Sequence, residues 1–135
     1  MNRKFVVIAG VLGALAVGLG AFGAHSLKSL LSAYQLGIFK TGIQYHFYHT
    51  FAILCLAILG QFSTYKYLQK ACWFFSFGIV LFSGSLYLLA TKDILGLNSI
   101  TSILGPLTPI GGVLFLIGWG LIISTGLQLK KPNAD

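Results

Sequence analysis

Residues 41–65, TGIQYHFYHTFAILCLAILGQFSTY, form an uncharged run of 25 residues between Lys40 and Lys66. A helix of about 20 residues crosses the roughly 30 Å of hydrocarbon in a bilayer. The run is therefore long enough for one transmembrane helix. Its first ten residues carry two of the three histidines of the chain, His46 and His49.

The rest of the sequence repeats this pattern. Further uncharged intervals of 23, 21 and 36 residues follow Lys4, Lys70 and Asp93. Only 8% of the 135 residues are charged and 56% are hydrophobic, whereas about 25% are charged in soluble domains. We expect one integral membrane domain, residues 1–135, that is all-α and forms a polytopic four-helix transmembrane bundle in the lipid bilayer. The expected helices are 5–24, 43–61, 71–89 and 109–127.

The first span, residues 5–24, is longer than the apolar part of a cleaved signal peptide, about 7 to 15 residues, so we expect it to be retained. Its small residues recur at every fourth position, as in Gly10, Ala14 and Gly18, with Gly20 in a second ladder. Such ladders let helix backbones approach closely in lipid. The pattern predicts close packing at the centre of the bundle or against a second copy. Because four thin helices bury a limited core, we expect a homo-oligomer or a complex with other membrane proteins.

The sequence also predicts the conformation of two connections between the spans. Residues 25–40, HSLKSLLSAYQLGIFK, place apolar residues at helical spacing between serines and lysines, which predicts a short interfacial helix between the first two spans. After Asp93, four residues interrupt the apolar pattern: Gly96, Asn98, Gly105 and Pro106. We therefore expect a loop there, and Thr108 followed by Pro109 as the start of the fourth helix.

The basic residues lie in the gaps between apolar runs, and none form a stripe suited to nucleic acid. With four spans, six fall on the side of the termini: Arg3, Lys4, Lys66, Lys70, Lys130 and Lys131. Three fall on the other side: Lys28, Lys40 and Lys92. The positive-inside rule then places both termini in the cytoplasm of a cell with this chain in its inner or plasma membrane.

This topology brings polar residues of all four helices to the outer end. The predicted cluster comprises His25, Gln44, Tyr45, His49, Ser83, Ser85, Tyr87 and Thr108. Tyr45 and His49 are four residues apart and share a helix face. We expect His49 to be neutral, hydrogen-bonded to hydroxyl groups of the neighbouring helices, and the centre of the cluster. We expect His46 to lie nearer lipid or water.

Five motifs carry a resemblance to a known family. They are GAFGAHSLK (20–28), TGIQYHFYHTFAIL (41–54), LFSGSLYLLA (81–90), TPIGG (108–112) and GW (118–119). In this order they resemble the YgdD-type family of small integral membrane proteins, a bacterial family of unknown function with animal relatives. His25 falls in the GAFGAH motif and His49 in the Y-x-x-x-H motif, while His46 stands where relatives have glutamine. The resemblance implies a four-helix inner-membrane protein and assigns no activity.

Several functions remain open at this point. The first is a structural or interaction component of the membrane. The alternative is a subunit of a small-solute or proton transporter or channel that uses the outer polar cluster, with histidine as the titrating group. A metal or haem site would need His25, His46 and His49, because Cys55 and Cys72 are expected to be small buried hydrophobic residues. An enzyme is not indicated: we find no nucleophile set, paired carboxylates or phosphate loop, and we expect no cofactor.

Overall fold

The computed structural model describes residues 3–60 and 66–128 of the chain. Four helices in these ranges are long and apolar enough to cross a membrane: Arg3–His25, Ala33–Leu59, Lys66–Leu95 and Asn98–Gln128. The described residues contain no strand. The expected all-α architecture with four spans is confirmed.

The first two spans are α1 (Arg3–His25) and α2 (Ala33–Leu59), joined by the short 3-10 helix η1 (Leu27–Ser29). The third span comprises α3 (Lys66–Gly78), the π-helical segment η2 (Ile79–Ser83) and α4 (Gly84–Leu95). The fourth is the short 3-10 helix η3 (Asn98–Ile100) followed by α5 (Thr101–Gln128).

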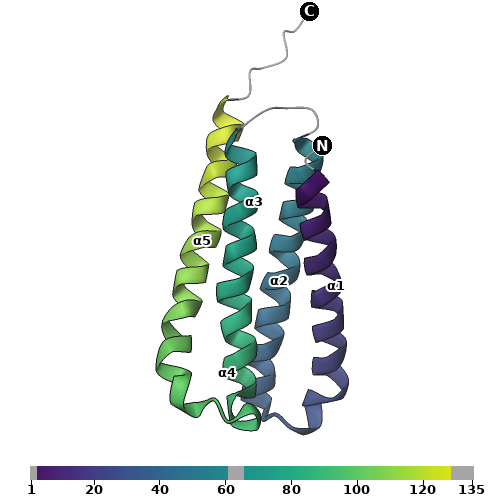
Figure 1. Ribbon diagram of the computed structural model, residues 1–135, viewed down its shortest axis with the longest axis vertical. Coiled ribbons are helices and arrows are strands. Elements are labelled where there is room, and N and C mark those ends of the chain that lie inside the picture. The colour runs from purple at the N-terminus through teal and green to yellow at the C-terminus, as the bar shows by residue number, and fades with distance from the viewer. Residues whose placement is uncertain (1–2, 61–65, 129–135) are drawn as a thin grey trace, which may run out of the picture.

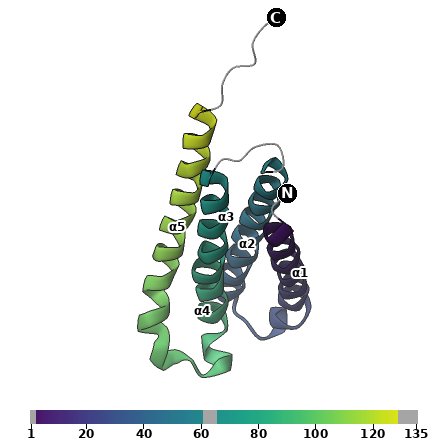
Figure 2. The ribbon, with the colours of Figure 1, turned by 45° about the horizontal axis from the view of Figure 1, so that its top comes forward.

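The four spans stand in a row in the order α1, α2, α3 with α4, and α5 (Figures 1 and 2). Most contacts between helices join neighbours in this row. The start of α1 and the end of α5 lie at the same end of the row, and η1 and η3 lie at the other (Figure 1). An open row leaves two broad faces for lipid, and α2 and the third span each have a neighbour on both sides.

The start of α2 corrects one expected boundary. Ser32 caps the helix: its Oγ accepts from the backbone N–H of Gln35 at 3.2 Å, and Gln35 Oε1 accepts from the Ser32 N–H at 2.9 Å. This reciprocal pair is a capping box. Residues 33–40 therefore form the first turns of α2, and η1 takes the place of the separate interfacial helix expected at residues 25–40.

The start of α5 corrects a second boundary. Gly96 ends α4 with a φ of 67°, in the left-handed region that glycine adopts without strain. Helix α5 then begins at Thr101 rather than at Pro109, and both Pro106 and Pro109 lie inside it. Prolines are tolerated in membrane helices because neighbouring groups satisfy the freed carbonyls.

Interlocked rings and glycines hold the third span against α5. Two phenylalanine rings each occupy a glycine position of the opposite helix, Phe75 at Gly118 and Phe115 at Gly78, and the backbone of Phe82 lies against Gly111. A Cβ atom at any of these glycines would lie within 2.5 Å of the phenylalanine. All three pairs share one antiparallel register, since seven residues forward on α5 correspond to seven residues back on the third span. Close backbone approach of this kind is how helices associate in lipid.

The small-residue ladder of α1 lies elsewhere. Gly10, Ala14 and Gly18 are exposed, and no neighbouring atom of the described residues comes within 4 Å of a Cβ placed on either glycine. Gly20 is half-buried, with Ile43 Cγ2 at 3.8 Å from such a Cβ. The expected packing of this ladder at the centre of the bundle is therefore wrong. Small residues occupy several faces of α1, and a different set, including Ala9, Ala16 and Gly23, is buried. The contact with a second copy remains a prediction.

Candidate functional site

A groove between α2 and α5 forms a cavity of about 820 Å³ on one face of the row. Residues on the α2 side include Tyr45, Tyr48 and Phe51, those on the α5 side include Gly112, Leu116 and Trp119, and Phe82 of η2 also lines it. We call this cavity the lateral groove. Tyr48, Phe51 and Leu116 are exposed, so the groove opens sideways toward lipid.

His49 lies in this groove with both ring nitrogens paired. Its Nδ1 lies 2.8 Å from the backbone oxygen of Tyr45, and Trp119 Nε1 donates to its Nε2 at 3.3 Å. A carbonyl oxygen only accepts and an indole N–H only donates, so the proton of the imidazole is on Nδ1 and the ring is neutral. The ring stacks on Phe115 with centroids 3.5 Å apart and planes 3° apart.

These contacts correct the expected partners of His49. The predicted hydroxyl groups came from Ser83, Tyr87 and Thr108, but none of them bonds to His49. The partner on α5 is Trp119, a residue that the sequence analysis noted only in its GW motif. Tyr45 does share the face of His49, with ring centroids 6.1 Å apart.

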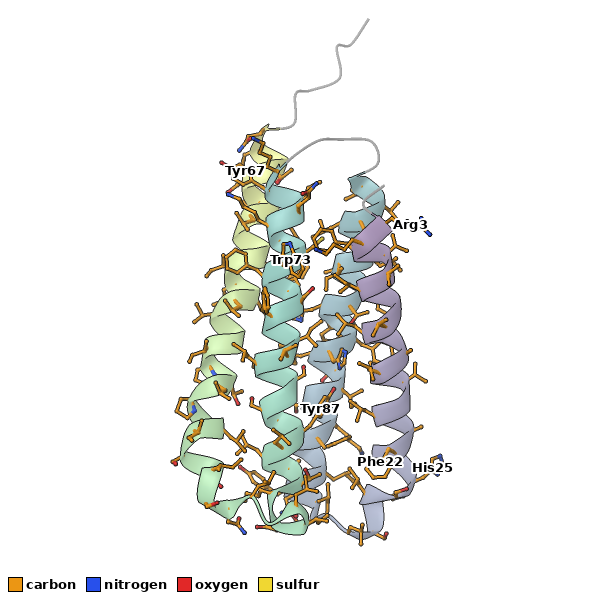
Figure 3. All side chains as sticks on the ribbon, viewed as in Figure 1. Arg3, Phe22, His25, Tyr67, Trp73 and Tyr87 are labelled. Carbon is orange, nitrogen blue, oxygen red and sulfur yellow. The ribbon has the colours of Figure 1, made fainter. Side chains whose placement is uncertain are left out.

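His46 is placed differently from the expectation. Its side chain is 4% exposed, and its Nδ1 lies 3.0 Å from the hydroxyl of Tyr87. Tyr87 lies on the side of the third span that faces α2 (Figure 3). The prediction that His46 faces lipid or water is wrong because α2 stands between two neighbours and is covered on both sides.

The remaining members of the predicted cluster lie at separate places in the bundle. The hydroxyl oxygens of Ser85 and Thr108 lie 2.7 Å apart and join α4 to α5. Gln44 Nε2 donates to the Tyr48 hydroxyl at 2.7 Å on the exposed side of α2. His25 is exposed at the end of α1 and points away from the other helices (Figure 3). The eight predicted residues thus do not converge on one centre.

No three His, Cys, Asp or Glu side chains within residues 3–60 and 66–128 lie close enough together to hold a metal ion. In particular, His25 lies apart from His46 and His49, so the suggested trio of imidazoles is not assembled. Cys72 is buried as expected, but Cys55 is exposed on α2, which corrects its expected burial. Cysteine is apolar enough to face lipid on a transmembrane helix.

Comparison with known proteins assigns this chain to a family. The family model described as "Protein of unknown function (DUF423)" matches residues 19–112. The membrane protein YwdK of Bacillus subtilis is 42% identical over 127 residues, covering 93% of this chain and 98% of YwdK. The inner membrane protein YgdD of Escherichia coli is 38% identical over 134 residues, covering 99% of this chain and 97% of YgdD.

A staphylococcal relative extends the similarity. The membrane protein SSP2132 of Staphylococcus saprophyticus is 41% identical over 121 residues, covering 90% of this chain and 94% of the relative. No solved structure matches the chain. The resemblance drawn from the five sequence motifs is confirmed, and so is the location of the protein in a membrane. This chain belongs to the DUF423 family of small integral membrane proteins, whose biochemical activity is unknown.

Proposed function

We propose that this protein is a structural or interaction component of the cell membrane that assembles side by side with further copies of itself. The observation that carries the proposal is the lateral groove, a large apolar cavity that opens toward lipid. In the proposed contact, the small-residue ladder of α1 in one copy occupies the lateral groove of the next. Both surfaces are exposed in the single chain.

The depth of the two surfaces in the bilayer supports this pairing. A Cβ on Gly13 would lie 3.7 Å from Thr50, and one on Gly20 would lie 3.8 Å from Ile43. Seven residues forward on α1 thus correspond to seven residues back on α2. By this register, Gly10 lies level with residue 53 of α2 and Gly18 with residue 45. The residues of α2 that line the lateral groove lie between these two levels. Two copies in one bilayer with the same orientation would present the ladder and the groove at the same height.

The ladder allows close approach of a second copy. It carries no side chain larger than a methyl group, although exposed Val7, Val11 and Val17 lie near it on α1. The groove has raised walls because Tyr48, Phe51 and Leu116 are exposed along its sides. Close packing of this kind drives helix association in lipid. Because the ladder and the groove are different surfaces, the contact is heterologous. Repeated contacts of this kind join the copies into a closed ring or an open-ended linear assembly.

Disulfide crosslinking in membranes tests the contact. In a Cys55→Ala background, Ala14→Cys combined with Tyr48→Cys should give covalent dimers and larger species on mild oxidation, because the two positions lie level in adjacent copies. Cys72 is 1% exposed and can be left in place. Ala14→Cys combined with Leu127→Cys is the matched control, since Leu127 is 84% exposed but lies near the end of α5. Equal crosslinking of both pairs, or none in either, would contradict the proposed contact.

We also propose that both termini are cytoplasmic. The end of the row where α1 starts carries Arg3, Lys4, Lys66 and Lys70, and the end with η1 and η3 carries Lys28, Lys40 and Lys92. Lys130 and Lys131 lie outside the described residues and add to the first group in the sequence. This bias supports a cytoplasmic location. A reporter active only in the cytoplasm should be active when fused after Asp135, and activity of a periplasmic reporter there would reverse the topology.

A further inference from the structure

Three buried polar atoms in the described part of the chain have no hydrogen-bond partner. They are His46 Nε2, Thr50 Oγ1 and Ser83 Oγ. The three side chains are 4%, 6% and 0% exposed. Two lie one turn apart on α2 and the third lies in η2. Unpaired polar groups are costly inside a membrane, where no bulk water can satisfy them.

The three side chains face the same region of the row. His46 is bonded to Tyr87, and Ser83 precedes Tyr87 by four residues on the face of the third span that packs against α2. Ile79, in the same π-helical segment as Ser83, belongs to the hydrophobic core cluster that also contains Ile53 and Leu56 of α2. Helix α2 and η2 are in direct contact. On the other side, Thr50 lies next to Gly13 of α1.

The orientation of two of the hydroxyl groups is unusual for this chain. Five other hydroxyls donate to the carbonyl four residues earlier, at 2.8 to 3.1 Å: Thr41 to Gly37, Ser76 to Cys72, Thr91 to Tyr87, Ser124 to Gly120 and Thr125 to Leu121. Such bonds to the helix backbone are the usual arrangement for a serine or threonine within a helix. Thr50 and Ser83 make no such bond. Their hydroxyls are free for a ligand outside their own helix.

Ser83 is the last residue of the π-helical turn η2. In this turn the carbonyl of Ile79, which stands four residues before Ser83, accepts from the backbone N–H of Gly84. Segments of this kind often occur at functional sites. Ser83 Oγ can act as both a donor and an acceptor toward a ligand.

We propose that His46, Thr50 and Ser83 form a binding site for ordered water inside the membrane, between α2 and η2 and beside α1. The chemistry of the site matches water, because it offers two hydroxyls and one ring nitrogen, and a buried water typically makes about three hydrogen bonds. On the neighbouring α1, Gly13 has no side chain, and a Cβ there would lie 3.7 Å from Thr50 Cγ2. Water in this site adds a polar link between α2 and the third span beside the His46–Tyr87 hydrogen bond.

Removing the hydroxyls tests the site. We expect Thr50→Val and Ser83→Ala each to lower the melting midpoint of the purified full chain in detergent, by about 3 °C or more. The double variant should lose less than the sum of the two shifts, because both hydroxyls serve the same water. Ser76→Ala is the matched control on the same span, since its hydroxyl bonds only to its own helix. If the two groups were truly unpaired, removing either would leave the midpoint unchanged or raise it, and that result would overturn the proposal.

A measurement on the wild-type protein covers the case in which a variant does not fold. Magnetisation transfer from water to the isotope-labelled protein should reach the amide protons of residues 50 and 83, although both lie deep in the row. The amide of Ile53, buried one turn further along α2, is the internal control and should show no transfer. Absence of transfer at residues 50 and 83 would overturn the site whatever the variants do.

Discussion

Replacing Gly111 by alanine adds one methyl group where α5 lies closest to the backbone of η2. The new Cβ would stand 2.4 Å from the backbone nitrogen of Phe82 and 2.8 Å from its Cα, whereas ordinary contacts begin at 3.4 Å. These backbone atoms cannot rotate away as the end of a side chain can. The two helices must therefore separate by about 1 Å, which weakens the dispersion contacts of the interlocked phenylalanines.

The size of the effect follows from two opposing terms. Overpacking of a close contact costs up to about 3 kcal/mol, and alanine recovers about 1 kcal/mol through its higher helix propensity than glycine. Because backbone atoms clash at Gly111, the cost should lie in the upper part of its range. We expect Gly111→Ala to lower the free energy of unfolding by about 1 to 2 kcal/mol.

Gly120→Ala is the matched control on the same helix, because within residues 3–60 and 66–128 no neighbouring atom lies within 4 Å of a Cβ there. This variant should be as stable as the wild type or slightly more stable. Both can be measured by titrating the folded protein in mixed micelles with sodium dodecyl sulfate and following helical circular dichroism. If Gly111→Ala and Gly120→Ala unfolded at the same denaturant fraction, α5 and η2 would not be as close as described.

Three further predictions use the same assay. Trp119→Phe keeps an aromatic ring but leaves Nε2 of His49 without its donor, so the free energy of unfolding should fall by about 1 kcal/mol; an unchanged value would refute this hydrogen bond. Ser85→Ala and Thr108→Val should show a coupling of about 0.6 kcal/mol in a double-mutant cycle, as is typical between membrane helices, and strictly additive effects would argue against the 2.7 Å contact. Ser32→Ala removes the N-cap hydroxyl that accepts from the Gln35 N–H and should cost about 1 kcal/mol, whereas equal stability would show that the start of α2 does not depend on it.

The number of spans could be predicted because charge is excluded from hydrocarbon, and the uncharged intervals mark the helices directly. Two helix starts were missed for different reasons. The Ser32 and Gln35 pair was present in the sequence as a capping signal, but the polar residues around it suggested an interfacial helix instead. Pro109 was interpreted as a first helical residue, yet in lipid a proline does not mark the start of a helix.

The candidate site was harder to predict because its contacts join distant residues. The sequence identified His49 as a buried, neutral residue, but its partner Trp119 is 70 residues away and its position depends on the register of the third span with α5. The sequence of residues 79–83 contains no signal for a π-helical turn. The unpaired hydroxyl of Ser83 therefore could not be predicted. The burial of His46 depends on α2 having a neighbour on both sides, a property of the row rather than of the helix.

The π-helical turn also sets the relative rotation of the two halves of the third span. If Ile79–Ser83 reverted to ordinary helix with the same number of residues, all later residues of the span would rotate by about 100° relative to the earlier ones. The half containing Phe75 is fixed by α5, while the half containing Tyr87 is fixed by His46 of α2. Such a change of helix type would break one set of contacts to keep the other. The wide turn is therefore what allows the two halves of one span to pack against two different helices.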